Sequence, residues 1–307
     1  MSVIVFGSIN MDLVARTPRL PAPGETLIGH VFETIPGGKG ANQAVAVARL
    51  GISTEMVGRV GGDTFGQELI NGLKLSGVGC DRVLIDPSTH SGVAMIAVDD
   101  ASENNIIVIP GANGQMGHDD IARLEALLPQ STVLLLQLEI PLPAVVAAAQ
   151  AAKRAGVRVI LDPAPARSDL PNELYPLVDI ITPNQVEASH LVGFPVVDVE
   201  SAAKAADVLN QRGVLTSIIK LGKSGALCRT GAETFQIPIF PVNAVDTVAA
   251  GDAFNGGLAA GLAAGLSLQD ATTQASAVGA LSVTKAGAQP SLPTRAELDA
   301  FLRHEKL

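Results

Sequence analysis

Residues 133–161 read V-L-L-L-Q-L-E-I-P-L-P-A-V-V-A-A-A-Q-A-A-K-R-A-G-V-R-V-I-L, and this stretch decides the fold class. It begins with an apolar run, Val133–Leu138, that has the length of a buried strand. A helical pattern follows at Ala144–Ala155, and a second short strand at Arg158–Leu161. Because this alternation continues through almost the whole chain, we predict an α/β fold with a three-layer, doubly wound, mostly parallel sheet.

The other predicted elements follow the same rhythm. Further strands are expected at Val3–Phe6, Thr54–Val60, Ile180–Thr182 and Ser217–Leu221. Further helices are expected at Ala41–Leu50, Phe65–Leu75, Ala202–Gln211, Phe254–Ala264, Leu268–Val283 and Arg295–Arg303. No repeat, low-complexity tract or linker divides the chain, so we expect residues 1–307 to form a single α/β domain.

Two stretches interrupt this rhythm, at about residues 13–36 and 91–109. They contain short β runs at Thr26–Ile28, Val31–Thr34, Val93–Val98 and Asn105–Ile109. We expect these runs to pair into a small discontinuous sheet that stands off the main domain as a lid. Such a lid excludes water from a reaction in which hydrolysis would waste the donor.

The composition argues against several classes of protein. The net charge of −9 argues against a nucleic-acid partner or an anionic membrane surface. Gly257, Gly261 and Gly265 have the spacing of a membrane-helix dimer face, but their apolar run is too short to span a bilayer. Cys80 and Cys228 match no metal spacing, and the N-terminal residues lack signal-peptide form. We therefore expect a cytoplasmic protein without a membrane span.

Residues 245–256, V-D-T-V-A-A-G-D-A-F-N-G, carry most of the chemistry. Small residues open a helical pattern here, and the free N–H groups of a helix start favour an anion. Asp252, at that start, is placed to take a proton from a group bound beside the anion. An anion cradle with a carboxylate base suits phosphoryl transfer to an alcohol. A capped helix start with an unused carboxylate is the alternative interpretation.

A second run, P-G-G-K-G-A-N-Q-A at residues 36–44, is not a P-loop, because Glu33 occupies the place of its first Gly. Lys39 and Asn42 favour a hydroxyl-binding turn over a plain Gly-rich turn. Asn10, Asp12, Glu139 and Asn184 follow predicted strands, where open α/β sheets bind ligands, although Asn184 also suits a helix N-cap.

Two loops complete the candidate site. K-L-G-K-S-G at residues 220–225 is either a turn that binds nucleotide phosphate or ribose, or an ordinary β-turn. T-K-A-G-A-Q-P-S at residues 284–291 is a small-residue loop. Its carbonyl groups, with Asp246 and Ser291, could hold a hard cation.

Together, these residues resemble the ribokinase-like (phosphofructokinase-B type) carbohydrate kinase family over essentially the whole chain. G-G-K-G-A-N-Q-A-V-A resembles the first signature of that family, and D-T-V-A-A-G-D-A-F-N-G resembles the second. G-A-Q-P-S at residues 287–291 supports the likeness. Two spellings depart from the usual ones: A-A-G-D stands for G-A-G-D, and D-P-A-P-A at residues 162–166 stands for N-P-A-P-A.

The resemblance implies a role for each group of residues. Asp252 would accept the proton of the primary hydroxyl of the sugar, and the N–H groups of Ala249, Ala250, Gly251 and Asp252 would form an anion hole. The sugar would be held by Asn10, Asp12, Gly38, Lys39, Gly40, Asn42, Glu139 and Asp252. ATP would be bound by Asn184, Lys220, Leu221, Gly222, Lys223, Ser224, Gly225, Gly251, Asp252 and Ser276. Glu187 would place magnesium through water, and potassium would be surrounded by Asp246, Val248, Ser282, Lys285, Gly287 and Ser291.

The activity implied by this resemblance is ATP-dependent phosphorylation of D-ribose at the 5-hydroxyl, giving ribose 5-phosphate and ADP. The lid would also form the interface of a homodimer. One alternative is a related kinase for deoxyribose, another pentose, a ketohexose or a nucleoside. Another is a non-catalytic sugar-binding regulator. A dinucleotide-dependent oxidoreductase is disfavoured because the first predicted strand is not followed by G-x-G-x-x-G.

Overall fold

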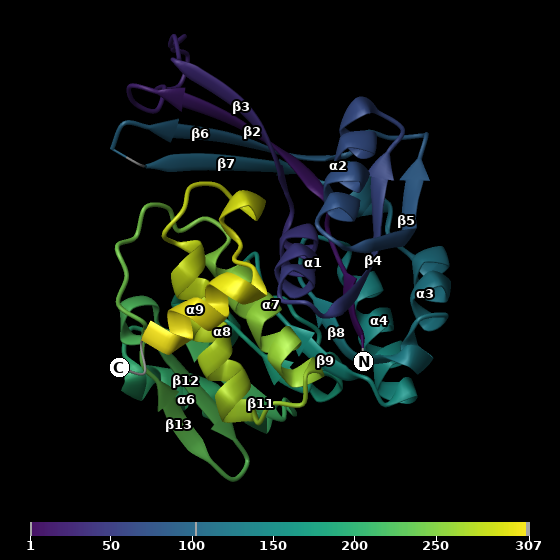
Figure 1. Cartoon of the computed structure of the whole chain (residues 1–307), viewed down its shortest axis with the longest axis vertical. Helices are drawn as coiled ribbons and strands as arrows, with labels where there is room; N and C mark the ends of the chain where they lie inside the picture. Colours follow the sequence, from purple (N-terminus) through teal and green to yellow (C-terminus); the bar gives the residue numbers. More distant parts are fainter. Residues whose placement is uncertain (1, 102, 305–307) are drawn as a thin grey trace.

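The computed structural model describes residues 2–101 and 103–304, and its main feature is a large sheet. The strands of this sheet are β1 (Ser2–Phe6), β4 (Ser53–Gly61), β5 (Gly79–Asp86), β8 (Ser131–Leu136), β9 (Arg158–Leu161), β10 (Ile180–Ile181), β11 (Thr216–Lys220), β12 (Ala226–Thr230) and β13 (Thr234–Ile237). They lie in the order β13-β12-β11-β10-β9-β8-β1-β4-β5, and Figure 1 labels both ends of the sheet, β13 and β5. All neighbours are parallel except β11–β12 and β12–β13, so the predicted mostly parallel sheet is confirmed.

Helices cover both faces of this sheet. One face carries α1 (Lys39–Arg49), α2 (Thr64–Leu75), α7 (Ala250–Ala263), α8 (Leu268–Ser282) and α9 (Arg295–His304). The other carries α3 (His118–Glu125), α4 (Leu142–Ala155), α5 (Gln185–Val192) and α6 (Val199–Gln211). Short 3-10 turns lie at Gly111–Gln115, Leu128–Gln130, Tyr175–Leu177, Gly222–Ser224 and Gln289–Ser291. The predicted three-layer architecture is therefore confirmed.

The central strand β1 shows how the sequence builds two cores. Successive side chains of a strand point to opposite faces of the sheet. Val3 and Val5 accordingly enter the core under α1 and α7, while Ile4 and Phe6 enter the core under α4. All four side chains are fully buried, which explains why central parallel strands have continuous apolar runs.

Helix α7 owes its place to glycine. A Cβ atom at Gly257 would lie 3.0 Å from the Cα atom of Ala275, and one at Gly261 would lie 3.1 Å from the Cα atom of Ala271. The glycine spacing therefore serves close packing of α7 on α8, as expected for a helix of a globular domain. No helix within the described ranges is both long and apolar enough to cross a membrane.

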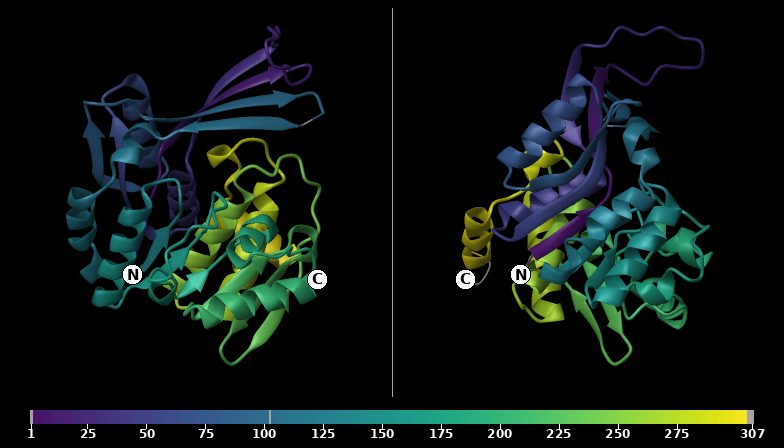
Figure 2. Two further views of the ribbon diagram at one scale, coloured as in Figure 1. Left: turned by 180° about the vertical axis from the view of Figure 1, so that it is seen from behind. Right: turned by 90° about the vertical axis from the view of Figure 1, so that its right-hand side faces the viewer.

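A second sheet stands off the large one, and its strands are β2 (Asn10–Thr17), β3 (Val31–Gly37), β6 (Gly92–Asp99) and β7 (Asn104–Ile109). Figures 1 and 2 show this small sheet projecting over the end of the domain. Its order is β3-β2-β6-β7, with β2 and β6 parallel, so it joins two distant parts of the chain, as expected. The hairpin of β6 and β7 is present where it was predicted.

Some predicted boundaries are wrong. Thr26–Ile28 is not a strand, and β2 takes its place as the partner of β3. The structure also contains β5, α3, α5 and the β12–β13 hairpin, which the apolar pattern did not indicate. Helix α7 begins at Ala250, four residues before the predicted start at Phe254, so Asp252 lies in its first turn.

Candidate active site

Asp252 is the centre of a buried polar cluster at the start of α7. Its side chain is held by two amides: Asn42 Nδ2 donates to Oδ2 at 2.9 Å, and Gln43 Nε2 donates to Oδ1 at 3.0 Å. Burial raises its pKa from 3.8 to about 6, against the lowering effect of the charge on Lys39. A carboxylate with this pKa is ionised at neutral pH and is still basic enough to accept a proton.

The backbone beside Asp252 has the form of an anion site. Ala249 is the N-cap of α7 and has φ 61°, the left-handed conformation that L-residues rarely adopt. In the described residues, it is the one non-glycine residue with positive φ. Ala249, Ala250, Gly251 and Asp252 all line one cavity, and the N–H groups of a first helical turn have no partner within the helix. Ala250 N does donate to Thr247 O, at 3.3 Å.

A second acidic group, Glu139, is surrounded by donors. Its Oε2 accepts from Ser8 Oγ at 2.6 Å, from Lys39 N at 3.1 Å and from Asn10 Nδ2 at 3.4 Å. Asn113 Nδ2 in turn donates to Asn10 Oδ1 at 2.7 Å and fixes that amide. The ends of β1 and β8 and the start of α1 therefore meet here, as the strand-end pattern predicted.

Asp12 and Lys39 carry the strongest electrostatic perturbations of this cluster. Burial, followed by the negative charges of Glu139 and Asp252, raises the pKa of Asp12 from 3.8 to about 7. Burial alone would lower the pKa of Lys39, but nearby carboxylates, Asp252 first, raise it above its ordinary value. Lys39 is thus a firmly charged cation among acidic groups.

The predicted hydroxyl-binding turn depends on its glycines. Gly38 has φ 87°, and a Cβ atom there would lie 2.7 Å from Asn10 N. Gly40 N donates to Ser8 Oγ at 3.3 Å, which ties the start of α1 to the end of β1. Asn42 is 5% exposed, and within the described ranges its Oδ1 has no hydrogen-bond partner. The site therefore presents a free, buried acceptor next to Asp252.

The cavity that Asp252 borders has a volume of about 860 Å³. Its polar wall includes Lys39, Asp162, Asn184, Lys220 and Gly251, and its apolar wall includes the segment 239–242. Of the predicted nucleotide-binding residues, Gly222, Lys223, Gly225 and Ser276 also line it, whereas Leu221 and Ser224 are not among the lining residues.

Asn184 and Glu187 combine two roles that the sequence left open. Asn184 Oδ1 accepts from Glu187 N at 2.8 Å, and Glu187 Oε2 accepts from Asn184 N at 2.7 Å, so the pair caps α5. Both residues also line the cavity. Burial raises the pKa of Glu187, and the charge on Lys220 opposes this rise. The carboxylate of Glu187 therefore lies in surroundings of low polarity, close to the cation of Lys220.

The predicted cation loop is partly assembled. Asp246 Oδ1 accepts from Val248 N at 3.0 Å, and Oδ2 accepts from Gly287 N at 2.9 Å. The ammonium group of Lys285 is paired with Glu297, so this residue can offer a cation only its carbonyl. Ser282 and Ser291 are buried, and their hydroxyl groups donate to Gly279 O and Ala288 O, each at 2.8 Å. Residues 2–101 and 103–304, this loop included, contain no group of three or more His, Cys, Asp or Glu side chains that could hold a metal.

Sequence reasoning missed the residues that connect these parts. Gln43 Nε2 donates to Asp162 Oδ2 at 2.9 Å as well as to Asp252, and Gln137 Nε2 donates to Gln43 Oε1 at 2.7 Å. Asp162 Oδ1 accepts from Lys220 Nζ at 3.1 Å. Gln43 and Asp162 both lie within motifs quoted above. The unusual Asp162 of D-P-A-P-A was the signal in the sequence that could have pointed to this link.

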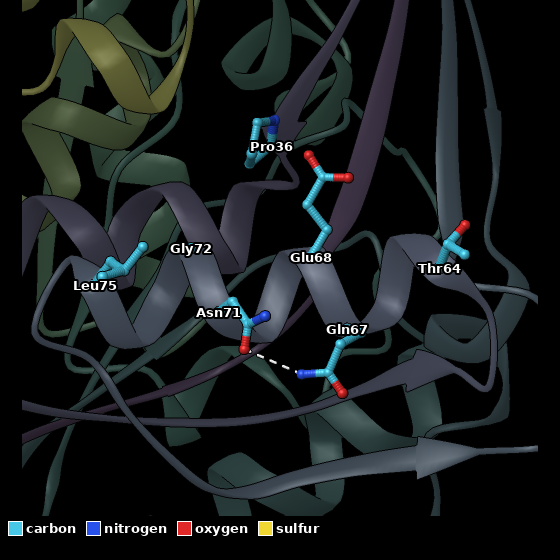
Figure 3. A pocket seen from close by; sticks show the side chains of 7 residues that line it. All are labelled: Pro36, Thr64, Gln67, Glu68, Asn71, Gly72 and Leu75. Atoms are coloured by element: carbon cyan, nitrogen blue, oxygen red, sulfur yellow. Dashed lines mark hydrogen bonds between the residues drawn. The ribbon is translucent and has the colours of Figure 1, made fainter.

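A different hollow, of about 540 Å³, lies against α2 and Pro36 (Figure 3). It shares no lining residue with the cavity at Asp252. Two side-chain amides that line the hollow are hydrogen-bonded to each other, because Gln67 Nε2 donates to Asn71 Oδ1 at 3.0 Å. Glu68 is the charged residue among the described residues that line this hollow, and neither a lysine nor an arginine lines it to hold a phosphate.

A buried carboxylate at a helix start, beside a cluster of polar side chains on a doubly wound sheet, has the chemistry expected of a phosphoryl-transfer site of the carbohydrate kinase class. The chain matches the model of the pfkB family carbohydrate kinases over residues 1–295, and it belongs to that family. It is 43% identical to the ribokinase of Haemophilus influenzae over 99% of both chains. It is 37% identical to the deoxyribokinase of Salmonella typhi, covering 98% of this chain and 99% of that relative. The structure of Arabidopsis thaliana ribokinase complexed with ribose and ATP matches with a TM-score of 0.90 and 34% identity over 98% of both chains.

Proposed function

We propose that the protein phosphorylates D-ribose at the 5-hydroxyl with ATP, giving ribose 5-phosphate and ADP. The observation that carries this proposal is Asp252, a buried carboxylate at a helix start, placed between a polyol-type cluster and a cavity large enough for a nucleotide. The similarity to ribokinases along the whole chain supports the choice of sugar.

The proposed reaction uses the residues as follows. Asp12, Glu139 and the free Oδ1 of Asn42 accept hydrogen bonds from sugar hydroxyls. Asp252 takes the proton of the 5-hydroxyl while that oxygen forms a bond to the γ-phosphorus of ATP. The bond from this phosphorus to the bridging oxygen breaks, and the electron pair leaves with ADP. The N–H groups at the start of α7 stabilise the charge on the moving phosphoryl group.

The chemistry of the donor sets fits two metal ions. Magnesium prefers oxygen ligands and keeps several waters, and Glu187 presents a carboxylate in the cavity wall that can hold such waters. Potassium would lie beside Asp246, among carbonyl groups of Val248, Ser282, Lys285, Gly287 and Ser291. When bound, magnesium neutralises charge on the phosphates, and we assign potassium the role of a monovalent activator that fixes the loop before α7.

We propose that the small sheet is both lid and dimer interface. Phe32, Met95 and Ile107 lie on one face of this sheet, and their side chains are 66%, 49% and 63% exposed. Exposed apolar patches of this kind mark protein interfaces. We propose that a second copy of the chain packs on this small sheet. It would cover the exposed apolar side chains, while β2 of the same sheet still carries Asn10 and Asp12 into the sugar cluster.

The test is an ADP-release assay over a panel of sugars, with and without potassium. We expect the highest kcat/KM for D-ribose. A higher kcat/KM for 2-deoxyribose would show that this protein is a deoxyribokinase instead. Absence of ADP release with every sugar, from a protein that still binds ribose, would favour a sugar-binding regulator.

A further inference from the structure

The pair of Asp162 and Lys220 lies where the fold alone does not require it. Lys220 Nζ is 3.1 Å from Asp162 Oδ1, and the two side chains are 15% and 2% exposed. Both residues line the large cavity and belong to neither hydrophobic core. A buried ion pair of this kind contributes little net stability, because desolvation offsets the attraction. The Asp162–Lys220 pair is therefore better explained as part of a functional site than as a contact that stabilises the fold.

The ammonium group of Lys220 faces the start of α7. A Cβ atom at Gly251 would lie 3.5 Å from Lys220 Nζ, so this cation borders the N–H groups of the anion site. An ammonium has three donors, and in the described residues Asp162 is the side chain that accepts from it. The remaining donors are available to an anion in the cavity.

Asp162 also reaches the base. Gln43 Nε2 donates both to Asp162 Oδ2, at 2.9 Å, and to Asp252 Oδ1, at 3.0 Å. The negative charge of Asp162 contributes to the raised pKa of Asp252. One carboxylate thus fixes the cation on one side and acts on the base on the other.

We propose that Lys220 is a further catalytic residue, which contacts the phosphoryl group in transfer, and that Asp162 is a positioning residue, which holds Lys220 beside the anion site and is coupled to Asp252 through Gln43. The inference rests on the proposed kinase function. Lys220 supplies charge only, so the bonds made and broken stay as described above.

The test compares Lys220→Met, Asp162→Asn and the double variant with wild type in the ADP-release assay. Removing one stabilising donor from a transition state lowers kcat by about 10²–10³ fold, and we expect this loss for Lys220→Met with ribose affinity within about twofold of wild type. The double variant removes both partners of the Asp162–Lys220 ion pair, so it tests the proposal if Lys220→Met fails to fold. We expect its kcat to match that of Lys220→Met within about threefold, because the two residues act as a unit. Lys204→Met, which removes an exposed lysine paired with Glu200, is the matched control.

Asp162→Asn should lower kcat by about tenfold and move the acid limb of the pH profile of kcat, measured at saturating ribose, to lower pH, a shift that a structural role would not produce. A double variant that binds ribose and keeps kcat within about twofold of wild type would overturn the proposal. Failure of the proposed function has a different signature, because wild type itself would then release no ADP. In that case, titration with ADP and a non-hydrolysable ATP analogue replaces the assay. Lys220→Met, or the double variant, should lose affinity for the analogue alone, and an equal loss for both nucleotides, or none, would overturn the proposal.

Discussion

Replacing Asp12 with Asn should stabilise the protein in the absence of sugar. The pKa of Asp12 is raised from 3.8 to about 7, chiefly by burial and then by the charges of Glu139 and Asp252. The folded protein therefore binds this proton more tightly than the unfolded chain, and the stability that this group contributes falls as pH rises from about 4 to about 7. At about 1.36 kcal/mol per pKa unit, the cost of the charged form reaches at most about 4 kcal/mol above pH 7.

The assay is chemical denaturation of wild type and Asp12→Asn without sugar, at pH 8 and pH 5. We expect the variant to gain up to about 4 kcal/mol at pH 8 and less than about 2 kcal/mol at pH 5, where wild-type Asp12 is mostly protonated. Calorimetry should show ribose affinity reduced by about tenfold or more, because a charged acceptor is lost. Asp119→Asn, at an exposed carboxylate, is the control. A gain that is equal at both pH values, or a less stable variant, would refute the reasoning.

Three further outcomes can be measured. Asp252→Asn should lower kcat by about 10²–10⁴ fold with ribose binding largely kept, and wild-type kcat at saturating ribose should fall below about pH 6 as this base is protonated; activity near wild type in the variant would contradict its role. Ala249→Gly should raise the free energy of unfolding by about 0.5–1 kcal/mol in denaturant titrations, because glycine adopts φ 61° without strain; a loss of stability would show that the alanine is not strained there. Ile107→Asp should shift sedimentation from dimer to monomer, and an unchanged mass would exclude the small sheet as the interface.

In the large sheet, the strands that the sequence revealed are mainly those buried on both faces. β1 and β8 consist of apolar side chains alone over most of their length, so pattern and burial coincide. β5 was missed because it is an edge strand, paired only with β4, and its sequence G-C-D-R-V-L-I-D carries three charges. Its pairing partner is 18 or more residues away along the chain, so no local pattern contains the information that makes it a strand.

The small sheet was predicted in outline and misassigned in detail. Asn10–Thr17 mixes polar and apolar residues, and its first residues were assigned to the end of the preceding strand. In the structure, residues 7–9 connect β1 to β2, which pairs with β3 on one side and β6 on the other. Parallel pairing of β2 with β6 unites segments about 80 residues apart, and only tertiary structure specifies such a register.

The candidate site also has a part that the sequence reveals and a part that it does not. Residues at strand ends and helix starts, such as Asn10 and Asp252, can be recognised because topology brings those ends together. The links between them cannot, since Gln43 is 119 residues from Asp162 and 209 from Asp252 along the chain. Buried polar contacts of this kind appear in a sequence only as ordinary letters within a motif.

The charge balance of the site gives a reason why bound ligands would stabilise the protein. Two lysines, Lys39 and Lys220, face a larger set of buried or half-buried acidic groups, namely Asp12, Glu139, Asp162, Glu187 and Asp252. The raised pKa values of Asp12, Glu187 and Asp252 show that several of these groups are held charged at a cost. In the proposed function, sugar hydroxyls that donate to these carboxylates, and a divalent cation near Glu187, would both relieve that cost. Part of the binding free energy at this site would therefore come from weaker repulsion among the carboxylates. A bound ligand would then also stabilise the folded protein.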